Sequence, residues 1–180
     1  MASTDELALL RQWLGESYDR SVRTAYLIVG NRDDAEDAVQ EAYLRAWRFR
    51  SSLSTKANFQ PWLYRIVVNA CNSMLRHEVP IRRARDNEDR LAEMPAARDR
   101  IDDVLVGSDV ARAIAQLPLH LRVVIVLRYY ADLSEREIAV AISRQPGTVK
   151  SRLTEARRRL SEHPALRPEP TELSTQEGRA

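Results

Sequence analysis

Hydrophobic residues recur along the chain at steps of three and four, and no long stretch alternates with the two-residue period of a β-strand. This period predicts an all-α fold in which each helix buries one face. Two short helices are expected within residues 4–30, and longer ones near 33–48 and 61–77. Further helices are expected at 110–117 and 120–131, after Ser134, and from Pro146 to Leu160.

The segment Leu133–Leu160 has the pattern of a helix-turn-helix. Ser134 and Glu137 have the spacing of a capping box, which starts a short helix. Pro146 suits the first turn of a second helix. In that second helix one apolar stripe leaves the polar residues on the opposite side, as a recognition helix requires. The stripe consists of Val149, Leu153, Ala156 and Leu160.

Positive charge is concentrated in this segment. Residues 144–160 contain six basic residues and one acidic residue, a net +5, whereas the whole chain of 180 residues carries only +2. Such a concentration indicates phosphate binding. A basic face that is merely solvated is the alternative.

The helix near Asp33–Arg48 carries acidic residues in its first turns and an acidic and amide face beyond them. Negative charge near a helix N-terminus is stabilised by the helix dipole, which is sufficient to explain the first turns. Docking of a basic partner is the alternative explanation for the whole face.

The helix expected at 61–77 contains two polar residues one turn apart, Asn69 and Ser73. Either they are simply exposed to solvent, or they contact bases, since an amide both donates and accepts at a base edge. Several aromatic residues nearby could support unstacked bases. These are Phe49, Phe59, Trp62 and Tyr64, with Trp62 assigned to the core.

Composition divides the chain into two small helical domains. Residues 1–78 form the first and residues 109–162 the second, joined by a flexible, highly charged linker at 79–108. Residues 163–180 are rich in Pro and polar residues, and a disordered tail is expected there.

Other functional classes lack support in the sequence. There is no Gly-rich phosphate loop, no Cys/His metal spacing and no nucleophile–base pair, so neither an enzyme, a cofactor nor a metal site is predicted. The single cysteine, Cys71, lies in an apolar run, which favours a buried residue over a redox sensor. One cysteine, no apolar run long enough for a membrane span and no signal peptide together indicate a cytoplasmic protein.

Four segments, in this order and spacing, resemble the extracytoplasmic-function (ECF) sigma factors, the small two-domain specificity subunits of bacterial RNA polymerase. The segments are Asp33–Trp47, Pro61–Asn69, Leu117–Tyr130 and Gly147–Leu153. The resemblance spans both domains and covers most of residues 18–160.

The resemblance implies a role for each surface. The last helix would read the promoter −35 element. The helix at 61–77 and the loop before it would contact the melted −10 element, and the acidic helix would dock on the polymerase clamp. The implied −35 residues are Thr148, Lys150, Ser151, Arg152, Thr154, Glu155 and Arg158. The implied −10 residues are Phe59, Arg65, Asn69, Ser73 and Arg76. The implied polymerase-binding residues are Asp37, Gln40 and Glu41.

The resemblance also implies partners. These are core RNA polymerase, through its clamp helices and flap, promoter DNA, and an anti-sigma factor, with the free chain a monomer that does not insert into a membrane. A stand-alone helix-turn-helix regulator is the alternative function.

Three residues depart from the family pattern. Ser143 lies where a glycine is usual in the turn, and Arg144 where an apolar residue is common. Glu155 replaces a usual arginine on the recognition helix, and because a carboxylate accepts from cytosine N4 we expect an altered −35 preference.

Overall fold

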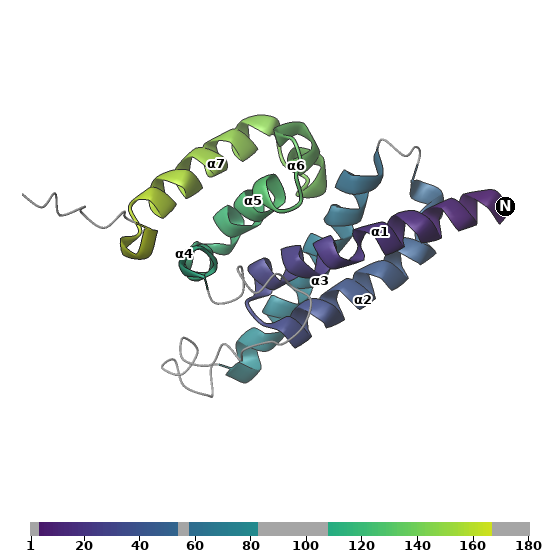
Figure 1. Ribbon diagram of the computed structural model, residues 1–180, viewed down its shortest axis with the longest axis horizontal. Helices are drawn as coiled ribbons and strands as arrows, with labels where there is room; N and C mark the ends of the chain where they lie inside the picture. The colour runs from purple at the N-terminus through teal and green to yellow at the C-terminus, as the bar shows by residue number, and fades with distance from the viewer. Residues whose placement is uncertain (1–3, 54–57, 83–107, 167–180) are drawn as a thin grey trace, which may run out of the picture.

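The computed structural model describes residues 4–53, 58–82 and 108–166, and all regular secondary structure in these residues is helical (Figure 1). The first three helices are α1 (Thr4–Val29), α2 (Arg32–Arg48) and α3 (Phe59–Arg82), with a 3-10 turn, η1 (Arg50–Ser52), after α2. The others are α4 (Asp109–Gln116), α5 (Leu119–Tyr129), α6 (Glu135–Ala141) and α7 (Pro146–Ser161), followed by the 3-10 turn η4 (Pro164–Leu166). The all-α prediction is confirmed.

The first helix differs from the prediction of two short helices within residues 4–30, because α1 is one continuous helix. Its buried face continues through Ser17, Ser21 and Thr24, which are 5%, 0% and 0% exposed. These small polar residues occupy core positions at helical spacing, so the apolar period is interrupted in the sequence while the buried stripe is not.

The helices α1, α2 and α3 pack against one another around a core of small, aliphatic and aromatic residues. Asn31 caps α2 by accepting a hydrogen bond from the Asp34 backbone N–H at 3.1 Å. The third helix was expected to end near His77, but its backbone remains helical to Arg82. Pro80 lies in the last turns, where its missing N–H removes a single helical hydrogen bond. Residues 83–107 of the predicted linker lie outside the described residues.

The C-terminal domain consists of α4–α7 and η4. Ser108 caps α4 through the Ala111 N–H at 3.2 Å, and the largely apolar α5 is buried among its neighbours. The tail predicted from residue 163 is wrong for its first four residues, because η4 contacts α4. The His163 ring there lies 3.1 Å from Gln116 Oε1.

The two domains contact each other in this structure: α3 packs against α6, and α1 packs against α4 and α5 (Figure 1). Arg122 on α5 joins them, because its guanidinium donates to the carbonyl of Ile28 in α1 at 2.7 Å. The same guanidinium donates to the carbonyls of Ala115 and Leu117 at the end of α4. Arg122 therefore caps the C-terminal ends of two helices from different domains.

Candidate nucleic-acid interface

The helix-turn-helix begins with the predicted capping box. Glu137 N–H donates to Ser134 Oγ at 3.3 Å, and Ser134 N–H donates to the Glu137 carboxylate at 2.8 Å. In the connection to α7, Ser143 adopts φ +52°, the left-handed region in which glycine is favoured. A serine therefore occupies a position in the turn whose backbone conformation is strained for any residue except glycine.

The helix α7 packs on α5 and α6 through Val149, Leu153 and Ala156, which are fully buried. Its other face exposes Lys150, Ser151, Thr154 and Arg158, with Thr148, Arg152 and Glu155 half-buried. The hydroxyls of Ser151 and Thr154 donate to the backbone carbonyls of Thr148 and Lys150, both at 3.0 Å. Their oxygen lone pairs thus remain available to accept hydrogen bonds from outside.

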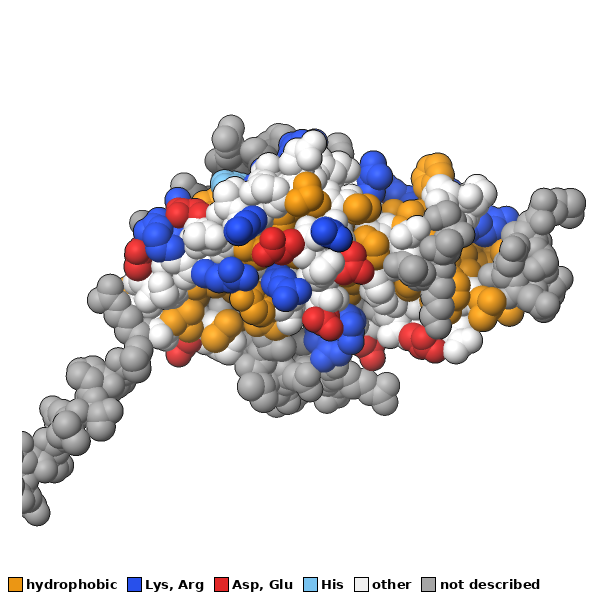
Figure 2. All heavy atoms as spheres, turned by 90° about the horizontal axis from the view of Figure 1, so that it is seen from above, with side chains coloured by type: hydrophobic (Ala, Val, Ile, Leu, Met, Phe, Trp, Pro, Cys, Tyr) orange, Lys and Arg blue, Asp and Glu red, His pale blue; other side chains and the backbone are white. Residues whose placement is uncertain are grey.

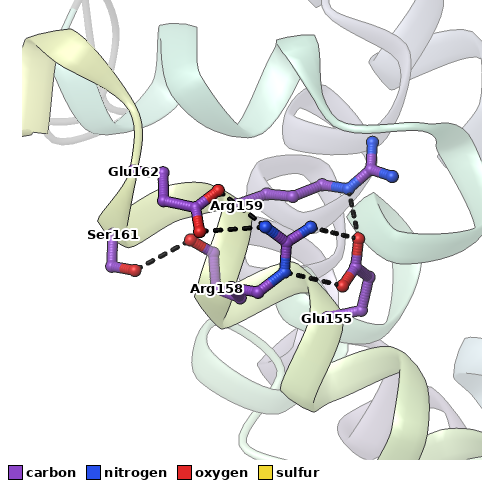
Figure 3. A network of polar contacts seen from close by, with 5 residues as sticks. All are labelled: Glu155, Arg158, Arg159, Ser161 and Glu162. Atoms are coloured by element: carbon purple, nitrogen blue, oxygen red, sulfur yellow. Dashed lines mark hydrogen bonds and ion pairs between the residues drawn. The ribbon is translucent and has the colours of Figure 1, made fainter.

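The C-terminal half of α7 carries a network of ion pairs around Arg158 (Figure 3). Arg158 donates to both Glu155 oxygens at 3.0 and 2.8 Å, and to both Glu162 oxygens at 2.9 and 2.7 Å. Arg159 donates to Glu155 Oε1 at 2.7 Å. These hydrogen bonds, first from Arg158 and then from Arg159, lower the pKa of the Glu155 carboxyl to about 2.

Half of the six basic residues of 144–160 are therefore already engaged. Arg158 and Arg159 are paired with glutamates. Arg157 donates to the Tyr129 hydroxyl at 3.0 Å, and its guanidinium lies 5.9 Å from the Tyr129 ring centroid. No ion pair with a described residue involves Arg144, Lys150 or Arg152. Figure 2 shows the consequence on the surface seen from above, where acidic side chains lie among the basic ones.

A second polar stripe lies on α3. Arg65, Asn69 and Arg76 are exposed and Ser73 is half-buried, at helical steps of four, four and three. The opposite side of α3 is buried in the bundle. This stripe remains exposed although α3 contacts α6, so the packing of the two domains leaves it accessible.

The aromatic residues near this stripe differ in accessibility. Tyr64 is fully buried in the core and Phe59 is 4% exposed, so neither is an exposed stacking surface. Phe49, in contrast, is 59% exposed. The half-buried Trp62 donates through Nε1 to Ser52 Oγ at 2.9 Å, which ties η1 to α3.

Phe59 instead lines a hollow between α1 and the start of α3, with a volume of about 280 Å³. Its lining residues are Trp13, Glu16, Ser17, Arg20, Phe59 and Gln60. Gln60 Oε1 is buried without a hydrogen-bond partner, while its Nε2 donates weakly to Ser17 Oγ at 3.4 Å. No local pattern in the sequence joins residues 13–20 to residues 59–60, so the α1 residues of this hollow were not predictable.

A third exposed face lies on α2, where Asp37, Gln40 and Glu41 project into solvent. Glu41 accepts from Arg45 Nε at 2.7 Å. One turn further along the same face, Leu44 is 59% exposed, and it was not among the predicted residues of this face. The sequence does mark this residue, because Leu44 is a large apolar side chain that falls outside the buried stripe of α2, an otherwise regular amphipathic helix.

Cys71 is fully buried, and burial raises its pKa to about 12, which fits a core residue. The described residues contain no cluster of potential metal ligands. None of the described helices has the length and apolar character needed to cross a membrane.

Comparison with known proteins relates both domains to one family. The family model for sigma-70 region 2 matches residues 15–79, and that for sigma-70 region 4 matches residues 108–160. The ECF RNA polymerase sigma factor SigE of Mycolicibacterium smegmatis is 32% identical over 167 residues, which cover 89% of this chain and 65% of SigE. The ECF RNA polymerase sigma factor SigM of Mycobacterium tuberculosis is 36% identical over 140 residues, covering 77% of this chain and 68% of SigM.

A solved structure has a similar fold. The sigma factor RpoE of Bartonella quintana, determined in complex with the anti-sigma factor NepR, matches with a TM-score of 0.62 and 27% identity. The match covers 88% of this chain and 93% of that one, so it includes both domains.

Proposed function

The chain belongs to the ECF sigma factors, and from this premise we propose that it binds core RNA polymerase and directs it to promoters by contacting two DNA elements. The observation that carries the proposal is that two polar stripes, on α3 and α7, are exposed in separate domains of one chain. The stripes differ in chemistry, as expected if one meets duplex DNA and the other melted DNA. No finding favours a stand-alone regulator.

We assign −35 recognition to α7 in the major groove. Lys150 and Arg152 supply positive charge for phosphates or guanine, and Thr148, Ser151 and Thr154 supply hydroxyls for base edges. Arg158 and Glu155 belong to the same face, but their charges are paired with each other in this structure. The N-terminal half of α7 therefore provides the unpaired donors, and it is this half of a recognition helix that reaches bases.

We assign −10 recognition to the α3 stripe and the neighbouring hollow. Asn69 is suited to a base edge, while Arg65 and Arg76 are suited to the backbone of a separated strand. The hollow has one apolar wall, formed by Trp13 and Phe59, whose ring centroids lie 5.4 Å apart. The half-buried Trp13 is the accessible part of this wall, and capture of an unstacked base against it would favour melting.

We assign polymerase docking to the α2 face. Asp37, Gln40 and Glu41 offer acceptors to a basic surface, and Leu44, one turn further along α2, adds an apolar contact beside them. By likeness to the Bartonella complex, we propose that an anti-sigma factor also binds this chain. Both proposed partners imply that the protein acts in the cytoplasm.

Run-off transcription tests this function directly. Core RNA polymerase from a related bacterium is incubated with pooled genomic fragments, with and without the protein, and discrete transcripts that depend on the protein are expected. An Asp37→Ala/Glu41→Ala double variant should lose both transcripts and co-elution with core polymerase. The matched control is Asp19→Ala/Asp109→Ala, which removes the same charge from α1 and α4, outside the proposed sites. No transcripts and no co-elution with the wild-type chain would refute the proposal.

A further inference from the structure

Glu155 occupies an unusual electrostatic position on α7. It lies on the outward face, one turn after Ser151, and its two oxygens accept three hydrogen bonds from Arg158 and Arg159. The partners follow it at i+3 and i+4, spacings at which side chains on a helix are neighbours (Figure 3). A carboxylate thus sits among the basic residues of the proposed DNA-binding helix.

The ion pairs are exposed, so they are weak and open to exchange. The side chains of Glu155, Arg158 and Arg159 are 36%, 53% and 46% exposed. Pairs of this kind contribute little to folding stability. A DNA phosphate approaching α7 competes with Glu155 for the same guanidinium donors, and it meets the negative charge of the carboxylate as well.

We propose that Glu155 acts as an internal counter-charge that weakens sequence-independent binding of DNA by α7, so that binding depends on base contacts from the N-terminal half of the helix. This inference rests on the proposed function of α7 as the duplex-binding helix. Specificity is a ratio of affinities, and it rises when non-specific phosphate contacts are suppressed while base contacts are retained.

The alternative role for Glu155 is direct reading of a cytosine. A carboxylate has about four acceptor positions, and the three hydrogen bonds from arginine leave about one. The two roles for Glu155, direct base contact and counter-charge, lead to different expected results. Loss of a reader changes which base is preferred at one position, whereas loss of a counter-charge strengthens binding to all sequences alike.

Glu155→Gln removes the charge while keeping the size of the side chain. It releases Arg159, and it leaves Arg158 paired only with Glu162. Each additional phosphate contact steepens the dependence of log affinity on log salt by about 0.9. We expect the full-length E155Q variant to bind duplexes about three- to tenfold more tightly near 100 mM salt, with a slope steeper by about one.

Fluorescence anisotropy with labelled 30-base-pair duplexes of random sequence measures this effect at several salt concentrations. Glu162→Gln is the matched control, because it removes the same charge from the same network but leaves Arg158 and Arg159 paired with Glu155. E162Q should change the affinity less than twofold. Thermal unfolding of both variants should match the wild type, because the network is exposed.

Three results would overturn the inference. These are wild-type affinity of E155Q, equal effects of E155Q and E162Q, or a change in selected sequences confined to one base pair. Run-off transcription with wild-type protein separates this inference from the proposed function. If the wild-type protein gives transcripts and E155Q binds duplex DNA with wild-type affinity, only the counter-charge role of Glu155 is refuted. If there are no transcripts and E155Q again binds with wild-type affinity, the proposed function is refuted as well.

Discussion

Replacing Arg122 by methionine should both destabilise the protein and loosen the contact between its domains. The guanidinium donates to Ile28 O at 2.7 Å and Leu117 O at 3.2 Å, and also to Ala115 O. Methionine keeps much of the aliphatic stem but removes the charge and every donor. Three carbonyls at the ends of two helices then lose a partner.

The size of the effect follows from these bonds. A hydrogen bond to a charged group contributes roughly 1.5–3 kcal/mol net, and the 2.7 Å bond to Ile28 is of this kind. The bond to Leu117 is near the long end of the range and adds less. Burial lowers the pKa of Arg122, so part of the gain is offset by lost hydration. We expect R122M to reduce the free energy of unfolding by about 2–3 kcal/mol.

Urea unfolding followed by circular dichroism measures the stability, and small-angle X-ray scattering measures the radius of gyration. Arg128→Met is the matched control, because Arg128 donates to Leu133 O at 2.9 Å within the C-terminal domain. R128M should lower stability without enlarging the molecule, whereas R122M should do both. Unchanged stability and unchanged radius of R122M would refute the role assigned to Arg122.

Three further predictions concern single residues. Ser143→Gly should raise the free energy of unfolding by about 0.5–1 kcal/mol, because glycine adopts the positive φ without strain; unfolding in urea measures it, and a loss of stability would contradict it. The raised pKa of Cys71 means that its thiol is neutral below about pH 12, so iodoacetamide at pH 8 should label only the urea-unfolded protein, and labelling of the native protein would contradict this. Lys150→Ala should reduce the salt slope of duplex binding by about one, whereas Arg76→Ala should leave that slope unchanged.

The local elements were predictable because their signals are local. The capping box at Ser134 and the apolar stripe of α7 are fixed by residues within two turns, and the structure confirms both. The division of α1 into two helices failed for a tertiary reason. Ser17, Ser21 and Thr24 are buried because neighbouring helices cover them, and no property of the residues themselves reveals this.

The candidate site was predictable in part. The exposed stripes on α2, α3 and α7 follow from helical spacing, and the structure leaves nearly all of their residues accessible. Phe59 was not predictable, because its burial depends on Trp13, which is distant in sequence. Residues 144–160 carry a net charge of +5, but the i+3 and i+4 neighbours of Glu155 already indicate in the sequence that part of this charge is paired.

The packed arrangement of the domains bears directly on the proposed function. By the positions that name them, the −35 and −10 elements lie about 25 base pairs apart, or roughly 85 Å of duplex at about 3.4 Å per base pair. A compact chain of this length has a radius of gyration of about 16 Å, too small to span that distance. Contacting both elements at once therefore requires the α3–α6 contact and the Arg122–Ile28 hydrogen bond to break. Binding of promoter and polymerase must therefore supply the free energy that Arg122 contributes to the packed arrangement. R122M should lower this cost of separating the domains while it also lowers stability.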